Sequence, residues 1–136
     1  MAFTLLNLRN IYKLHNSKNL NHIFNTIRSS YTKGDYKNLY NYKSENLFDI
    51  IKNDYFLFRV HLSILQPGIV EKSNLPRQLC LLEGKLFIND NNSSLNLVEG
   101  CYLARTKNYI ENKTNDPCVV ISHVDLRNNL QDIPLL

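Results

Sequence analysis

The segment 77–124 constrains the fold most, because short apolar segments alternate with turn signals throughout it. Glu-Gly pairs, a run of five polar residues and an Asn-Asp-Pro sequence separate the segments, which cover 77–82, 85–89, 95–98, 101–104, 108–111 and 118–124. Glycine supplies the positive φ that tight turns and bulges need. Many short strands divided by such turns indicate a sandwich or a small barrel. We therefore predict an all-β fold.

The strand pattern begins upstream of this segment. From Tyr55, apolar residues recur at every second position as far as Ile64, which predicts a strand with one buried face. Pro67-Gly68 ends that strand in a turn, and 69–71 is a further short extended piece. A chain of 136 residues fits one domain. We assign residues 55–125 to the barrel and 126–136 to an irregular C-terminal tail.

The polar, tyrosine-rich region 34–54 is predicted to be a linker that contains one short helix. Ser44 is a suitable N-cap, and the apolar residues of 45–52 would give such a helix one buried side. Tyr36 and Tyr40 stand four residues apart, so both would lie on one face if their own stretch is helical.

Residues 1–33 differ from the rest of the chain in charge. The leader has five basic residues and no acidic one, whereas the remainder has eleven basic and twelve acidic residues, so the net charge of +4 comes from the leader. The folded body has no basic stripe, which argues against specific DNA binding. No apolar run is long enough to span a bilayer.

Two interpretations of the leader remain open. Absence of acids, scattered cations and an amphipathic period are typical of a mitochondrial presequence, which predicts a mitochondrial location in the matrix or on the matrix face of the inner membrane. The alternative is a helical arm that packs on the domain or on a partner. The candidate partner contacts are the apolar helical face and the two tyrosines: Leu20, Ile23, Phe24, Ile27, Tyr36 and Tyr40.

The order of strands and glycines in 56–125 resembles the cupin superfamily of small jelly-roll barrels. In that family a first motif places two His and a Glu before a glycine. A second motif places a glycine before a proline turn, a His and an Asn four residues later. Gly84 matches the closing glycine of the first motif and Gly100 the opening glycine of the second, and Asn115 falls at the Asn position. The resemblance implies a cupin-like jelly-roll barrel.

The departures from the family pattern concern the metal ligands. The two His positions of the first motif fall on Glu71 and Ser73, its Glu position falls on Arg77, and the third His position falls on Glu111. Imidazole and carboxylate groups bind a divalent metal through lone pairs. Arg77 offers no lone pair and would repel the ion. We therefore predict a barrel with no metal and no cofactor, in which these charged residues form an ion-paired network.

The remaining candidate chemistry is limited. His61 and His123 lie on predicted strands and could line the barrel, although a strand histidine is more often structural. Cys80, Cys101 and Cys118 lack the spacing of metal ligands, and an odd number of cysteines in a reducing compartment favours free thiols. Cys101 follows a glycine and is the candidate for reactivity. The sequence contains no phosphate-binding glycine loop, GxSxG or HExxH motif.

Two classes of function remain open. The first is a non-catalytic accessory subunit of a mitochondrial multi-protein assembly such as the respiratory chain, ATP synthase or ribosome, with its leader also suited to peripheral contact with anionic lipid. The second is a metal-independent isomerase or epimerase of the cupin type, or a binder of small anions. Its candidate ligand-binding residues are Arg77, Glu71, Glu111, His61 and His123. We favour the subunit, because the usual reactive residues are missing.

Overall fold

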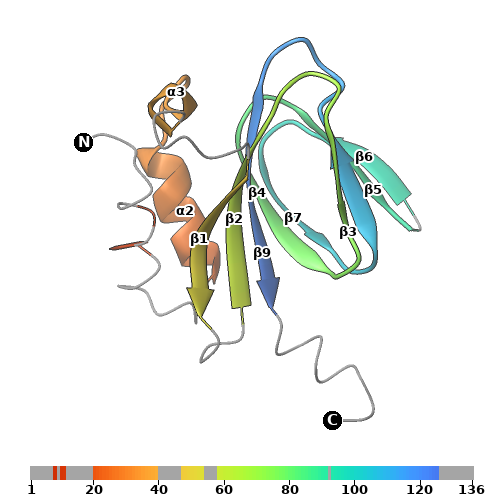
Figure 1. Ribbon diagram of the computed structural model, residues 1–136, viewed down its shortest axis with the longest axis horizontal. Coiled ribbons are helices and arrows are strands. Elements are labelled where there is room, and N and C mark those ends of the chain that lie inside the picture. Colours follow the sequence, from red (N-terminus) through yellow and green to blue (C-terminus); the bar gives the residue numbers. More distant parts are fainter. Residues whose placement is uncertain are drawn as a thin grey trace.

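The strands of the protein form two antiparallel sheets that face each other (Figure 1). The computed structural model describes residues 8, 10–11, 20–39, 47–53, 58–91 and 93–125. The five-stranded sheet has the order β1-β2-β9-β4-β7 and the four-stranded sheet the order β3-β8-β5-β6. The bounds of the strands are β1 Leu47–Asn53, β2 Phe58–Leu65, β3 Val70–Ser73, β4 Arg77–Glu83, β5 Leu86–Asp90, β6 Ser93–Leu97, β7 Gly100–Ala104, β8 Asn108–Glu111 and β9 Cys118–Asp125.

This architecture confirms the predicted all-β barrel and most of its strands. The last strand in the chain, β9, occupies the centre of the five-stranded sheet and pairs with both β2 and β4. Its β-branched sequence suits that central position, because branched side chains pack well on a pleated surface with neighbours on both sides. The Pro67-Gly68 turn is also present: Gly68 has φ 85° and donates its N–H to the Asn112 carbonyl at 2.8 Å.

The helix expected at 45–52 is wrong for the part that the structure describes, because 47–52 belong to the strand β1. This strand pairs antiparallel with β2 from Leu47 opposite Ser63 to Asn53 opposite Phe58. A register shift between Asp49 and Ile51 interrupts the ladder. A helix of eight residues has little stability of its own, whereas a strand at this position gains backbone hydrogen bonds to β2. The supposed linker therefore contributes the edge strand of the larger sheet.

Helix α2, Leu20–Ser30, packs against the outer face of the five-stranded sheet (Figure 1). Its period of 3.6 residues brings Ile23, Phe24 and Ile27 to one face, and each is at most 1% exposed. They pack among apolar side chains of the sheet, namely Val60, Leu62, Ile64, Cys80, Val119 and Ile121.

The proposed partner contacts of the leader are therefore largely occupied within the chain. Leu20 and Tyr36 are partly buried and pack against the same core. Tyr36 begins the short helix α3, Tyr36–Leu39, while Tyr40 lies outside the described residues, as do most of 1–19 and all of 126–136. Burial of the apolar face of α2 against its own sheet leaves that face unavailable to another protein.

A pair of hydrogen bonds fastens the segment after α2 to the barrel. The Tyr31 hydroxyl and the Gly34 backbone N–H donate to Glu83 Oε1 at 2.6 and 2.7 Å. Burial raises the pKa of Tyr31 well above its usual value, and the hydrogen bond to the Glu83 carboxylate raises it further. Glu83 ends β4, so the helix and the sheet are joined at that point. Within the described ranges, no helix is long and apolar enough to cross a membrane.

Candidate functional site

The interior of the barrel changes from apolar to polar along its strands. Alternate residues of a strand share one face, so the inward positions of β4 are Leu81, Leu79 and then Arg77. Strand β9 likewise passes from Val120 to Ser122 on its inward face. We call the buried cluster of Leu65, Leu79, Leu81, Leu86, Ile88, Ile110, Cys118 and Val120 the apolar end. The polar mouth comprises Arg59, His61, Ser63, Glu71, Arg77, Asn108 and Ser122.

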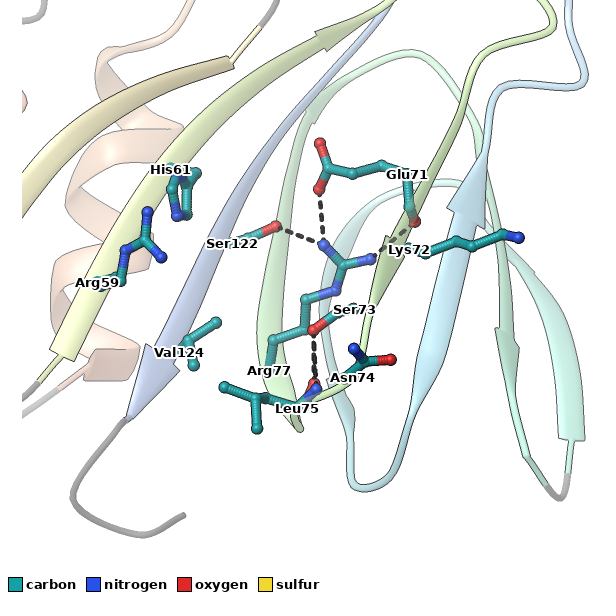
Figure 2. A pocket seen from close by; sticks show the side chains of 10 residues that line it. All are labelled: Arg59, His61, Glu71, Lys72, Ser73, Asn74, Leu75, Arg77, Ser122 and Val124. Atoms are coloured by element: carbon teal, nitrogen blue, oxygen red, sulfur yellow. Dashed lines mark hydrogen bonds and ion pairs between the residues drawn. The ribbon is translucent and has the colours of Figure 1, made fainter. Parts of the chain in front are cut away.

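A cavity of about 500 Å³ opens at the polar mouth (Figure 2). Arg59 and His61 line it from β2, Glu71 and Ser73 from β3, and Arg77 and Ser122 from β4 and β9. Lys72, Asn74, Leu75 and Val124 complete the lining. The volume falls in the range of small-molecule sites, which are concave and carry a few placed polar groups.

Arg77 is the most deeply buried charged residue of the cavity lining. Its side chain is only 3% exposed, and its guanidinium donates hydrogen bonds from three nitrogens. Nη1 donates to Glu71 Oε1 at 2.7 Å and to Ser122 Oγ at 3.4 Å, and Nη2 donates to the Glu71 carbonyl at 3.2 Å. Nε donates to Asn108 Oδ1 at 2.8 Å. Arg77 thus joins β3, β4, β8 and β9 around one planar group.

Glu71 completes this network. Its Oε1 accepts from Arg77, and its Oε2 accepts from the Ser63 hydroxyl at 2.7 Å. Burial lowers the pKa of Arg77, whereas the charge of Glu71 and its hydrogen bond act in the opposite direction. A buried guanidinium without a carboxylate partner would cost several kcal/mol. The Glu71 pair therefore makes burial of Arg77 tolerable.

Three of the five candidate ligand-binding residues come together here, and two do not. Arg77, Glu71 and His61 all line the cavity (Figure 2). Glu111 alternates with the inward-facing Ile110 on β8, so it lies on the outer face of the smaller sheet. His123 stands opposite Val60 in the register of β2 and β9, on the side of the sheet that α2 covers.

Asn108 occupies the inward position that the sequence analysis assigned to Glu111. It is buried, and its Nδ2 donates to the carbonyls of Leu75 and Thr106 while its Oδ1 accepts from Arg77. Asn112 follows four residues later and is fully buried. The spacing of these two asparagines matches the His and Asn positions of the second motif, three residues earlier than counting from Gly100 placed them.

Asn112 has a structural role in the turn before β9. Its Nδ2 donates to the Leu65 and Asp116 carbonyls at 2.8 and 2.6 Å, and its Oδ1 accepts from the Thr114 N–H at 2.9 Å. The exposed Asn115, which the sequence analysis placed at the motif position, has no such network among the hydrogen bonds of the described residues. Ser63, Arg59 and Ser122 were also missed, because only strand register shows that they face the mouth.

The polar mouth contains a cation where a metal site would need lone pairs. Among the residues that the structure describes, no group of three or more His, Cys, Asp or Glu side chains could hold a metal ion. Arg77 and Asn108 stand at motif positions of ligand residues, and Arg77 contacts the carboxylate that would otherwise be a ligand. The geometry is that of a hydrogen-bonded ion pair.

Comparison with known proteins supports the fold assignment. No protein-family model and no curated protein matches the sequence. Among solved structures, TT1209 from Thermus thermophilus has a TM-score of 0.53 and 16% identity, covering 63% of this chain and 88% of that one. The cupin domain of Cnp3 from Schizosaccharomyces pombe has a TM-score of 0.51 and 17% identity, covering 63% and 64%.

A third similar structure is the Cupin_2 domain of an XRE-family transcriptional regulator from Enterobacter cloacae. Its TM-score is 0.50 at 14% identity, and the match covers 57% of this chain and 92% of that domain. Identities this low establish a common fold without transferring an activity. The chain therefore has the fold of the cupin superfamily, as its two glycine motifs predicted.

Proposed function

We propose that the barrel binds a small organic anion in the cavity at its polar mouth and acts as a non-catalytic binding module. The observation that carries this proposal is the charge of the cavity lining, which has three cations, Arg59, Lys72 and Arg77, and a single carboxylate, Glu71. Arg77 and Glu71 offset each other as an ion pair. Arg59 adds a second cation on the inward face of β2, and Lys72 adds a third at the edge of the lining.

The positions of these cations suit an anion that enters from solvent. Arg59 is half-buried on the wall formed by β2, next to the inward-facing His61. Lys72 alternates with the inward-facing Glu71 and Ser73 on β3, so its exposed side chain projects outside the cavity (Figure 2). Charges in a concave, partly desolvated site act more strongly than the same charges on an open surface. Ser73 and Asn74 add neutral polar groups on the opposite side of the cavity (Figure 2).

The hydrogen bonds of Glu71 favour a non-catalytic binding role over an acid–base reaction. A general base must be positioned to reach the proton it removes. The Glu71 carboxylate is held in the ion-pair network by two protein donors, Arg77 on Oε1 and Ser63 on Oε2. His61 is the other candidate acid–base residue in the cavity lining, and a metal-independent isomerase needs a pair of such groups that are both placed to reach the substrate.

The test is a calorimetric titration of the full-length protein with a panel of small carboxylates and phosphate monoesters, including citrate, succinate and glucose 6-phosphate. Glycerol is the neutral control. We expect saturable binding by at least one anion, weakened by added salt. Arg59→Gln should weaken that binding by about tenfold or more, since a hydrogen bond to a charged group contributes about 1.5–3 kcal/mol.

Arg105→Gln is the matched control. Arg105 is exposed and does not line the cavity, so this variant should bind as the wild type does. The melting temperatures of both variants are measured as well, so that a folding defect is not mistaken for lost binding. Absence of saturable binding across the panel, or equal affinity of Arg59→Gln and wild type, would overturn the proposal.

An accessory role in a mitochondrial multi-protein assembly is a second candidate. It is supported by the basic, acid-free leader and by three exposed apolar side chains on or next to β3, Ile69, Val70 and Leu75. Binding of an anion and membership of an assembly are compatible. Native-size separation of mitochondrial extracts tests this role: co-migration with stable partners supports it, and migration as a monomer contradicts it.

A further inference from the structure

Cys80 and Cys101 face each other across two neighbouring strands. Cys80 on β4 stands directly opposite Cys101 on β7 in the antiparallel register. Directly opposite residues project from the same face of a sheet, and their Cα atoms lie about 4.5–5.5 Å apart. A disulfide requires a Cα separation of roughly 4.4–6.8 Å. The backbone therefore already holds the two Cα atoms at a separation that a disulfide can bridge.

The two cysteines differ in access. Cys101 is exposed, whereas Cys80 is fully buried in the core beneath α2. An incoming reagent can therefore reach one sulfur directly and the second only through the first. Dithiol sites that react in sequence need this asymmetry, with one accessible thiol and one resolving thiol in contact with it.

We propose that Cys101 and Cys80 form a dithiol site that reacts with small-molecule disulfides and closes to a cross-strand disulfide, with Cys101 as the attacking thiol and Cys80 as the resolving thiol. This site lies on the helix side of the five-stranded sheet, away from the polar mouth, and is independent of anion binding.

The electrostatics of the site agree with this order. A hydrogen bond from the Cys80 thiol lowers the pKa of Cys101 to about 7, burial opposes the shift, and the positive charge of Arg28 on α2 lowers it further. The thiolate is the nucleophile in disulfide exchange. At neutral pH a substantial fraction of Cys101 is therefore in the reactive form.

In the first step the Cys101 thiolate attacks one sulfur of the disulfide RSSR. The S–S bond of the reagent breaks, a Cys101–SR mixed disulfide forms, and the departing thiolate RS⁻ takes up the proton that Cys101 lost. In the second step Cys80, after losing its own proton, attacks the Cys101 sulfur and releases a second RS⁻, which is protonated in turn. The protein loses two hydrogens and the reagent becomes two thiols.

Capping of Cys101 also prepares Cys80 for the second step. In the reduced protein the pKa of Cys80 is raised, first by its hydrogen bond to Cys101, then by burial and by the charge of the Cys101 thiolate. The mixed disulfide carries no such charge. Two of the three causes then disappear, and the positive charge of Arg28 acts against burial alone.

The experiment treats the reduced full-length protein with oxidised glutathione, blocks remaining thiols and maps the tryptic peptides. Lys85 lies between the two cysteines, so they fall on separate peptides, 78–85 and 86–105. We expect these two peptides to become linked and Cys118 to stay unmodified. Cys118 is fully buried in the apolar end and stands opposite Leu65, so it serves as an internal control.

Single variants separate the two roles. Cys80→Ser should stop at a glutathione adduct on 86–105. Cys101→Ser should lower the rate of reaction of the remaining thiols by roughly tenfold or more, because buried thiols are inert. Cys118→Ser should react as the wild type does. If Cys101→Ser fails to fold, the wild-type peptide map still decides the question, because it identifies the first sulfur to be modified.

Two results would overturn the proposal. One is a wild-type protein that stops at the mixed disulfide and never links 78–85 to 86–105. The other is first modification at Cys118 or Cys80 instead of Cys101.

Discussion

The two ends of the barrel interior are built from the same strands but are stabilised differently. At the apolar end, Leu, Ile and Val side chains fill the space between the sheets and are almost completely buried. At the polar mouth, the inward positions of those strands hold Arg77, Ser122 and Ser63, and a cavity of about 500 Å³ remains. Apolar side chains fill one end of the barrel, whereas the other end has a cavity lined by a hydrogen-bonded ion pair.

This difference separates folding from binding. Apolar burial contributes roughly 25 cal/mol per Å² and needs no special geometry. The Arg77–Glu71 pair contributes little net stability once the desolvation of two charges is counted, but it is costly to break. Its four-strand connection fixes the shape of the mouth. We infer that the apolar end carries most of the stability of the barrel, whereas the polar mouth provides the proposed anion site.

The largest expected effect is at Arg77. Arg77→Ala should lower the free energy of unfolding by about 3–5 kcal/mol, because the Glu71 carboxylate and the Asn108 amide oxygen lose their partner in a buried site. Urea unfolding measures this change. Arg105→Ala, at an exposed position, is the matched control and should change stability by less than about 0.5 kcal/mol.

A double variant sharpens the comparison further. Replacing Arg77 with Met and Glu71 with Leu removes both charges together, which is often neutral or stabilising for a buried ion pair. We expect this variant to recover most of the stability that Arg77→Ala loses and to change the affinity of the mouth for anions. A double variant as unstable as Arg77→Ala would show that the ion pair itself is needed for folding.

A smaller loss is expected at the apolar end from Gly84→Ala. Gly84 has φ 88°, and a Cβ at this position would lie 2.9 Å from the Pro117 carbonyl oxygen. Positive φ alone costs an alanine about 1–2 kcal/mol, and the overlap adds roughly 1–3 kcal/mol. Gly100→Ala is the matched control, because Gly100 has φ 92° but open space where its Cβ would stand. Equal losses in the two variants would contradict the close approach of Gly84 to the strand β9.

The smallest effect concerns pH and Cys118 at the apolar end. Burial, and to a lesser extent the charge of Glu83, raises the pKa of Cys118 to about 12. The unfolded chain ionises this thiol near pH 8.5, so the unfolded state binds fewer protons than the folded state above that pH. The contribution is therefore fully present below about pH 8.5 and is lost as the pH rises towards 12.

The measurement compares urea unfolding of wild type and Cys118→Ala at several pH values. The stability difference between them should change by up to about 1.4 kcal/mol per pH unit between about pH 9 and 11. The wild type should lose more stability than the variant over that range. A constant difference would mean that Cys118 is as accessible to solvent in the folded state as in the unfolded one.

The sequence predicted the barrel strands well because their signals are local. The alternation in β2, the β-branched run of β9 and the turns at Gly68 and Gly84 depend only on neighbouring residues. The failure at β1 has the same origin: an apolar segment with a good N-cap suits a short helix locally, and only its pairing with β2 decides otherwise.

The candidate site was predicted in part, because it depends on strand register. Arg77 and Glu71 followed from the spacing before Gly84, and the structure joins them directly. Counting from Gly100 placed the next position at Glu111, but the connection between β7 and β8 is short, so Asn108 faces the mouth instead. The contact between Cys80 and Cys101 was also beyond the sequence, because no local pattern shows which strands are neighbours.

Anion binding at the polar mouth is tested most directly by amide NMR of the full-length protein. The protein is titrated with whichever anion of the panel binds most tightly. We predict chemical-shift changes concentrated on the parts of β2, β3 and β9 that line the cavity, with little change in α2 or at Ile88 and Ile110 in the apolar end. Shifts concentrated on other surfaces, or none at saturating anion, would contradict anion binding at the polar mouth.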